Sequence, residues 1–333
     1  MNARFRKILN FLKRSIIVMT VGLFVLAITG MVYQTAATES DQRKYPPPGN
    51  LIDVGGFKMH IHCEGEGSPT VILEAASGGT SLNWGWIQPE VQKETRVCVY
   101  DRAGFGWSES DPRSPTLART VRNLHTLLVN ANVKGPYVMV GHSLGGVYGR
   151  GFAAEYPDEV VGVVLLDEAH PQQFVKYPEM FAEGDSYLKM LNGIKLAARL
   201  GVNHLYFAFG GEMDFAGLSE PQKSQLKALW SSPRFFEMQG AEIRAARNLW
   251  GDALKLDDLG DLPLMALSSG AGLGFEWDKY QTELAILSTN SRYMKVEGSN
   301  HGSLVFDQQY AHVVSDAILQ VLDAVRNGTR LGD

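Results

Sequence analysis

The stretch from Tyr137 to Gly146 constrains the fold of this chain more than any other feature. It is a short apolar run followed by Gly141-His142-Ser143-Leu144-Gly145. This is the G-x-S-x-G spacing that places a serine on a sharp turn between a buried strand and a helix. Glycines stand on both sides because a strained backbone at the serine leaves no room for side chains two positions away. The sequence therefore predicts an exposed nucleophilic hydroxyl at Ser143.

The residues around this turn agree with that interpretation. The run 138–140 is typical of a buried parallel strand, and the stretch from Leu144 to about Tyr156 is typical of a helix that ends before Pro157. The dipole of such a helix favours a negatively charged oxygen next to Ser143. The alternative is a strand-to-helix turn with a structural serine.

The composition is that of a globular protein. The 333 residues, 45% of them hydrophobic and 20% charged, are enough for one large, elaborated domain. The net charge of −5 gives no reason to expect nucleic acid as a partner. The sequence contains no metal-ligand cluster and no phosphate-binding loop, so we expect no cofactor.

The N-terminus predicts a membrane anchor. Residues 1–14 are basic, and Ile16 to Tyr33 spans 18 almost entirely apolar residues, just enough to cross a bilayer. By the positive-inside rule, residues 1–14 stay in the cytoplasm, 15–33 form a single-pass signal anchor, and the rest is exported. A cleaved signal peptide is the alternative, since small residues follow at 35–37, but no clear cleavage site does.

The two cysteines, Cys63 and Cys98, both fall on expected strands. In an exported protein, a disulfide between them is chemically permitted. Two buried thiols that pack as small hydrophobic groups are an equal alternative. The sequence leaves both open.

The order of elements predicts an α/β protein. Residues 34–49 are polar and then proline-rich, which predicts a stiff, extended linker. Strands then alternate with helices up to residue 171, which is typical of a mostly parallel sheet covered on both faces. From 172 to 259 the sequence becomes helical and rich in large apolar residues. The expected strands are 51–54, 57–62, 70–75, 96–100, 138–140, 160–166, 263–267 and 291–296, with helices at 117–131 and 310–326.

Several motifs together resemble the α/β-hydrolase superfamily. They are the hairpin at 51–62, the glycine-rich turn at 77–80, Asp101 to Ser108, the turn around Ser143, and Gly298-Ser299-Asn300-His301-Gly302. The resemblance covers the chain from about Asn50 to Leu322. It implies an α/β-hydrolase fold with an eight-stranded, mostly parallel sheet and a helical cap inserted after the sixth strand. The implied organisation is a hydrolase core at 50–171, a cap at 172–259, and the rest of the core at 260–333.

The resemblance also implies a catalytic histidine on a loop after the last strand. His301 stands there, and the order Ser143 then His301 agrees with a nucleophile that precedes its base. His170 is the rival, but it lies too close to the expected acid. The other histidines are expected to be structural or at the surface: His60, His62, His125, His142, His204 and His312.

The catalytic acid departs from the commonest pattern of the family. Many relatives carry an aspartate shortly after the seventh strand, but residues 268–274 contain no carboxylate. Asp167, at the C-terminal end of the sixth strand, is a position that some members use instead, and it is the acid we expect. Asp278 and then Glu276 are the alternatives. A helix cap or turn residue is the structural alternative for Asp167.

An oxyanion hole needs two backbone N–H groups. Leu144, directly after the serine, supplies one by the resemblance. Ala76 supplies the other, from the turn after the third strand. Relatives often show His-Gly where this chain has Glu74-Ala75. The hydrogen-bond network around Glu74 is therefore left open.

The expected activity is that of a serine hydrolase, carboxylesterase-like or lipase-like, which cleaves an ester of an apolar small molecule through an acyl-enzyme. A serine nucleophile argues against dehalogenase and epoxide-hydrolase chemistry, for which the superfamily uses an aspartate. The large apolar residues of the cap are expected to form mostly its own core, and some to line an apolar pocket. They are Phe174, Tyr177, Met180, Phe181, Tyr187, Met190, Leu191, Tyr206, Phe207, Phe209, Met213, Phe215, Trp230, Phe235, Phe236, Met238 and Trp250.

Two other functions use the same features. An aminopeptidase or amidase would have the same triad and would need a carboxylate that holds a substrate ammonium, for which Glu183, Asp185, Glu212 and Asp214 are candidates. A non-catalytic small-molecule-binding protein on the same fold is the second alternative. The expected partners are a small apolar ester or amide and the membrane.

Overall fold

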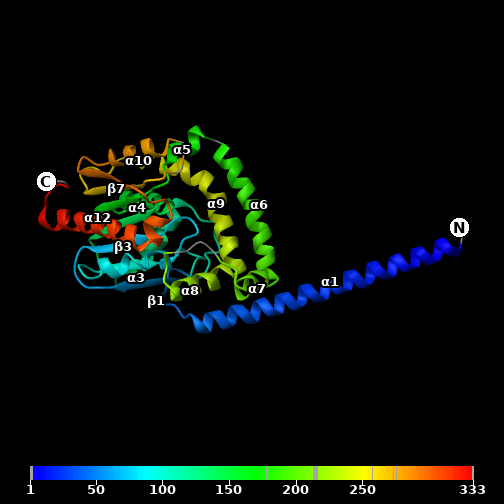
Figure 1. Cartoon of the computed structure of the whole chain (residues 1–333). Helices are drawn as coiled ribbons and strands as arrows, with labels where there is room; N and C mark the ends of the chain where they lie inside the picture. Colours follow the sequence, from blue (N-terminus) through cyan, green and yellow to red (C-terminus); the bar gives the residue numbers. More distant parts are fainter. Residues whose placement is uncertain are drawn as a thin grey trace.

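One eight-stranded sheet forms the centre of the protein (Figure 1). The computed structural model describes residues 3–177, 179–212, 217–256, 258–272, 274 and 276–331. The strand order is β1-β2-β4-β3-β5-β6-β7-β8; β2 is antiparallel to both its neighbours, and the later pairs are parallel. The strands are β1 (Asn50–Asp53), β2 (Lys58–Glu64), β3 (Thr70–Glu74), β4 (Val97–Tyr100), β5 (Tyr137–His142), β6 (Val160–Leu166), β7 (Leu264–Ser269) and β8 (Ser291–Val296). The predicted α/β-hydrolase architecture is confirmed.

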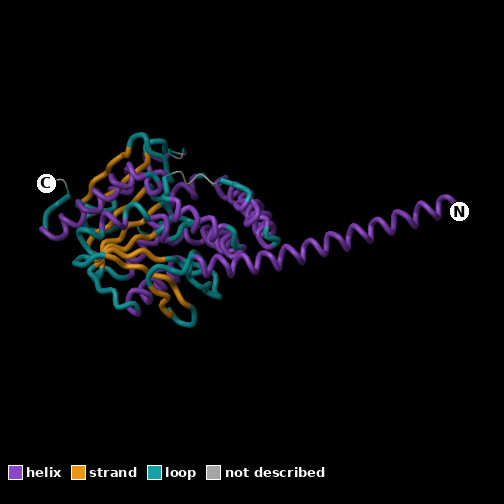
Figure 2. Tube along the Cα trace, turned by 60° about the horizontal axis from the view of Figure 1, so that its bottom comes forward, coloured by secondary structure: helices purple, strands orange, loops and turns teal. Residues whose placement is uncertain are grey.

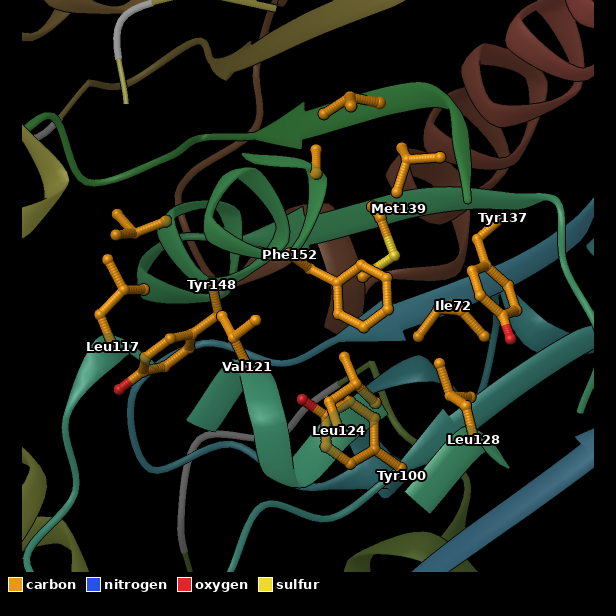
Figure 3. Close-up of a cluster of buried hydrophobic side chains, with 14 of the residues drawn as sticks. Ile72, Tyr100, Leu117, Val121, Leu124, Leu128, Tyr137, Met139, Tyr148 and Phe152 are labelled. Carbon is orange, nitrogen blue, oxygen red and sulfur yellow. The ribbon is translucent and has the colours of Figure 1, made fainter. Parts of the chain in front are cut away.

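Helices cover both faces of the sheet because its central strands are apolar on both sides. In β5, Met139 points into the core layer shared with α3 (Leu117–Asn130) and α4 (Leu144–Glu155). Its neighbours Val138 and Val140 point into the opposite layer. That layer is shared with α2 (Gln88–Val91), α11 (Ser303–Phe306), α12 (Gln308–Asn327) and the short 3₁₀ turn Ser81–Trp84. Figure 3 shows the first layer, where Met139 and Ile72 meet Leu124 and Phe152.

Helices replace strands between β6 and β7, as the sequence predicts for 172–259. They are α5 (Pro171–Lys176), α6 (Glu179–Arg199), α7 (Val202–Ala208), α8 (Glu220–Trp230) and α9 (Pro233–Ala253); α10 (Trp277–Ala285) follows β7. The long helices α6 and α9 pack against each other on one side of the body (Figure 1). Leu191 and Ala198 of α6 share a small apolar core with Phe235 and Phe236 of α9.

The N-terminal helix α1 is longer than the sequence predicts. It runs without a break from Ala3 to Lys44, so the expectation of an extended linker at 34–49 is wrong for most of that segment. The reason is that the first proline is Pro46, and 34–44 contain neither proline nor glycine. The N-terminal part of α1 projects away from the body in both views (Figures 1 and 2). By length and composition, α1 can cross a membrane.

Cys63 and Cys98 form a disulfide. The two residues lie directly opposite each other on the antiparallel strands β2 and β4. Of the two alternatives, the structure therefore selects the disulfide. It ties the antiparallel edge of the sheet to β4, the first parallel strand.

The disulfide gives a prediction about stability. It closes a loop of 35 residues, and its loss increases the conformational freedom of the unfolded chain. We expect the double variant Cys63→Ser/Cys98→Ser to lose about 3 kcal/mol of unfolding free energy, seen as a fall of roughly 5 °C in Tm. A reducing agent should lower the Tm of the wild type by a similar amount and leave the variant unchanged. Equal Tm values for variant and wild type would contradict this.

Candidate active site

Ser143 lies on a strained turn between β5 and α4. Its backbone has φ +54° and ψ −122°, a conformation that side-chain-bearing residues rarely adopt. A Cβ atom on Gly141 would collide with the backbone of Gly145, and one on Gly145 would collide with the carbonyl of Glu74. The glycines on both sides are therefore required by close backbone packing, which is the reason inferred from the sequence.

The structure brings His301 and Asp167 together. His301 lies in the loop between β8 and α11, and its Nδ1 is 2.6 Å from Oδ2 of Asp167. Asp167 follows β6 directly, is fully buried, and has φ +48°. The C-terminal ends of parallel strands meet at one edge of the sheet, which is why these residues lie near Ser143. Ser143 and His301 line the same cavity.

The carboxylate of Asp167 is held in its ionised form by its donors. Oδ1 accepts hydrogen bonds from the Trp277 indole N–H (2.7 Å) and the Ser269 backbone N–H (2.9 Å), and Oδ2 from the Ser269 hydroxyl (2.9 Å). Burial would raise the pKa of Asp167, but the hydrogen bond and charge of His301 together with these donors hold the pKa below its usual value. Ser269 belongs to the segment 268–274, which has no carboxylate of its own, and it donates to Asp167 instead.

The two alternative acids lie elsewhere. Asp278 is 2.9 Å from Lys295 and has a mostly exposed side chain. Glu276 pairs with Lys176 and accepts a hydrogen bond from the Tyr177 hydroxyl. Within the described part of the chain, neither carboxylate contacts His301. Both are engaged in surface ion pairs.

The other histidines near the site are neutral. His170, the rival base, accepts a hydrogen bond from the backbone N–H of Gln172 and stacks on Tyr280, and burial lowers its pKa to about 4. His142 is buried beside His301. Burial, and next the charge of His301, lower the pKa of His142 to about 3. Nε2 of His142 is 3.1 Å from the carbonyl oxygen of His301, a contact that sequence reasoning missed.

The two predicted oxyanion donors come from different elements near the serine. Leu144 is the first residue of α4, so its N–H has no partner within the helix. Ala76 lies in the loop after β3 and lines the cavity with Ser143. In the described residues, neither N–H donates to another protein group.

The loop that carries Ala76 is held by Arg102. This guanidinium donates to Glu74 Oε1 (2.6 Å) and to the carbonyl oxygens of Ala75 (2.6 Å) and Ala76 (2.7 Å). It also donates from Nε to Glu242 of α9 at 3.0 Å. Arg102, Glu74 and Glu242 are buried. The structure thus answers the question that the sequence left open at Glu74: an ion pair replaces the usual histidine.

Glu242 completes this arrangement from the side of the helical segment. Its Oε2 accepts from the Ser77 hydroxyl (2.7 Å) and the Gly78 N–H (3.0 Å). The loop is therefore bound through its carbonyls to Arg102 and through its donors to α9. Nothing in the sequence pattern indicated Glu242, because it stands 140 residues from Arg102.

Two carboxylates share the single guanidinium of Arg102. Burial raises the pKa of Glu74 to about 7, although Arg102 opposes this shift. The Tyr100 hydroxyl also hydrogen-bonds Glu74. The carboxyl group of Glu74 therefore titrates near neutral pH.

Two adjoining hollows of about 510 Å³ each lie over Ser143 and share Ser77, Ser143, Gly184 and Ile243 as lining residues. Their walls come from α6, α9 and the loop after β3. In the part of the chain that the structure describes, no His, Cys, Asp and Glu side chains are grouped to hold a metal ion.

Ten of the large apolar residues of the helical segment fall into three sets. Phe174, Tyr187, Trp230 and Trp250 line the hollows, and Leu191, Phe235 and Phe236 are buried between α6 and α9. Met190, Tyr206 and Phe209 are exposed, which the sequence did not predict. The side chains of Met180, Phe181, Met213 and Phe215 lie outside the described residues.

The candidate ammonium-binding acids are similarly spread. Asp185 lines the hollows, whereas Glu212 is exposed and lies 3.6 Å from Lys227. Glu183 and Asp214 lie outside the described side chains. Glu242, which sequence reasoning missed, also lines the hollows.

Comparisons with known proteins identify relatives of this chain. Residues 67–317 match the model of a family described as the alpha/beta hydrolase family. The uncharacterized protein YqjL of Bacillus subtilis is 26% identical over 276 residues, which cover 80% of this chain and 89% of YqjL. The chain matches about half the length of two further curated relatives, 48% of the uncharacterized protein YbdG of Bacillus subtilis and 52% of the uncharacterized protein C23C11.06c of Schizosaccharomyces pombe, at 26% and 28% identity.

Solved structures show the same fold. A thermophilic esterase from Thermogutta terrifontis superimposes with a TM-score of 0.59 at 19% identity, covering 83% of this chain and 97% of the esterase. The epoxide hydrolase CorEH superimposes with a TM-score of 0.63 at 20% identity, covering 83% and 98%. At these identities the likeness concerns the fold alone.

The raised pKa of Glu74 predicts a pH-dependent stability. Between its ordinary value of 4.5 and about 7, the carboxyl group keeps its proton only in the folded state. The contribution of the protonated Glu74 to the free energy of unfolding is therefore complete below pH 4.5 and is lost as the pH rises through 7. We expect the unfolding free energy of the wild type to fall by about 3 kcal/mol relative to Glu74→Gln over this range.

The measurement is Tm against pH for both proteins, with the exposed Glu297→Gln as a matched control that keeps the wild-type slope. If the difference between wild type and Glu74→Gln does not change with pH, the carboxyl group is not protonated in the folded state.

Proposed function

The chain belongs to the alpha/beta hydrolase family, and on that premise we propose that it is a serine hydrolase that cleaves carboxylic esters of apolar small molecules. The observation that carries this proposal is the strained serine at the end of β5 on a cavity that His301 also lines, with His301 paired to a buried carboxylate. A nucleophile, a base and an acid on three strand ends are the parts that acyl transfer needs.

In the proposed reaction, Ser143 attacks the ester carbonyl while His301 removes the proton from its hydroxyl. The oxygen that becomes negative is bound by the N–H groups of Leu144 and Ala76. His301 then donates the proton to the leaving alcohol, and an acyl-enzyme remains on Ser143. A water molecule, activated by the same histidine, hydrolyses it and restores the enzyme.

Asp167 orients the base in this mechanism. Because the carboxylate is 2.6 Å from Nδ1, it favours the tautomer with the proton on Nδ1 and leaves Nε2 to accept the serine proton. Its lowered pKa keeps it negative when the imidazole becomes charged. That charge stabilises the imidazolium.

The cavity supports an apolar ester as substrate. The rings of Phe174 and Trp250 are stacked with their centroids 3.9 Å apart, and they form an apolar wall beside Ser143. Leu188 and Ile243 extend that wall. Such a surface suits an acyl or alkyl chain.

The proposal includes a membrane anchor. Helix α1 carries basic residues at its N-terminus and the apolar run 16–33, whose large side chains are exposed. We place residues 1–14 in the cytoplasm and the catalytic domain on the other side of the membrane. The disulfide between Cys63 and Cys98 supports an oxidising compartment.

The roles of Ser143 and Asp167 are tested by hydrolysis of p-nitrophenyl esters of graded chain length. Relative to wild type, we expect kcat to fall by about 10⁶ in Ser143→Ala and about 10⁴ in Asp167→Asn. The exposed Asp278→Asn is the control and should keep wild-type activity. An active Asp167→Asn would assign the acid elsewhere. No turnover by folded wild type would favour amide substrates or a binding role.

Glu242 gives a second test, because it holds the loop that carries Ala76. Glu242→Gln keeps the shape but removes the charge that Arg102, Ser77 and Gly78 share. We expect kcat to fall about tenfold with a smaller change in KM, since a displaced donor affects mainly the transition state. Glu237→Gln, exposed on the same helix, is the control. An effect on KM alone would mean that Glu242 only shapes the pocket.

A further inference from the structure

Helix α7 presents its apolar side to solvent. Val202, Leu205, Tyr206 and Phe209 are exposed by 48%, 41%, 52% and 87%, and their spacing of three and four residues places them on one face. The polar residues Asn203 and His204 face the protein instead, where they bind Trp230 and α1. A surface helix of a soluble domain has the opposite arrangement. We name these four residues the α7 stripe.

The position of α1 indicates what covers the α7 stripe. Gly30 of α1 packs so closely against Leu200 that a Cβ atom would collide with the Leu200 backbone, and Gly201 meets the ring of Tyr33. His204 then lies 2.9 Å from both Gln34 and Asp41 of α1. The apolar run of α1 therefore ends beside the start of α7. Figure 1 shows α6 and α7 on the side of the body from which α1 projects.

The charge of this region matches an anionic surface. From Ser186 to Gly211 the chain contains Lys189, Lys195 and Arg199 and no acidic residue, although the whole protein has a net charge of −5. Basic residues beside a membrane-crossing helix are attracted to anionic headgroups. Aromatic residues such as Tyr206 are favoured at the same depth.

We propose that the α7 stripe lies in the interfacial region of the bilayer that α1 crosses, so that the helical segment over the active site rests on the membrane. This rests on the proposed membrane anchor. It adds a consequence for the substrate: α6 lines the catalytic hollows with Gly184 and Leu188 and exposes Met190, which is two residues from Leu188 and therefore on the other side of the helix. One helix therefore separates the hollows from the lipid, and the substrate is an ester dissolved in the membrane.

The test uses nitroxide labels on the full chain in vesicles of phosphatidylcholine with a minor fraction of phosphatidylglycerol. Both native cysteines are in the disulfide, so an introduced thiol is labelled alone. Phe209→Cys probes the stripe, and Ile286→Cys at the end of α10 is the matched control, an isolated apolar residue with 80% exposure. We expect oxygen to reach the label at 209 better than a water-soluble nickel chelate, and the reverse at 286.

A third label, Phe24→Cys in the apolar run of α1, separates the two proposals. A label at 24 that is accessible to the nickel chelate would overturn the membrane anchor itself. A label at 24 in lipid with a label at 209 in water would overturn only the contact of the α7 stripe. Spin–spin coupling between labels at 209, with neither reagent reaching them, would assign the stripe to a second copy of the chain and also overturn the proposal.

Activity gives an independent measurement. We expect Leu205→Glu/Phe209→Glu to reduce turnover of a long-chain ester in the vesicles about tenfold, while hydrolysis of a short, water-soluble ester stays at the wild-type rate. Ile286→Glu should change neither. Equal loss on both esters would mean that the stripe supports the fold and does not contact lipid.

Discussion

The strained turn at Ser143 can form only if the packing around it is exact on every side. A residue with φ +54° between a strand and a helix is strained, and it persists only where its surroundings hold it. Here β5 is buried between two apolar layers, and the backbones of Gly141, Gly145 and Glu74 meet without side chains between them. The packing of the whole sheet thus fixes one hydroxyl at its edge.

The same edge collects buried charge, and the structure compensates each charge locally. Asp167 has donors on both oxygens, and Arg102 has carboxylates and carbonyls around it. An unpaired charge at these positions would be strongly destabilising, since burial removes its hydration. Low exposure also strengthens the remaining interactions, so the loop with Ala76 is held in place before any ligand binds. The compensation of buried charges therefore both stabilises the fold and preorganises this loop.

The sequence predicts what depends on local spacing. Ser143 follows from its flanking glycines and the sheet from alternating apolar runs, whereas Asp167 and His301 follow from the resemblance to the α/β-hydrolase superfamily. It does not predict what depends on contacts between distant residues: the ion pairs of Arg102 with Glu74 and Glu242, and the choice between disulfide and thiols, which needs the register of β2 against β4. The prediction of an extended linker was wrong because polar residues without proline are equally able to continue a helix.

The orientation of the α7 stripe also depends on contacts between distant residues. Its spacing is visible in the sequence, but the direction it faces depends on where Gly30 and Gly201 let α1 approach. Gln34 and Asp41 of α1 both contact His204 of α7. Helix α1 and the helical segment therefore pack together and are not connected only by a flexible linker. This contact requires residues 34–44 to be helical. In the proposed membrane-anchored protein, an extended, flexible chain at 34–44 would leave the catalytic domain free to rotate above the membrane. With α1 in the membrane as we propose, its contact with α7 gives the hollows over Ser143 a fixed orientation relative to the lipid.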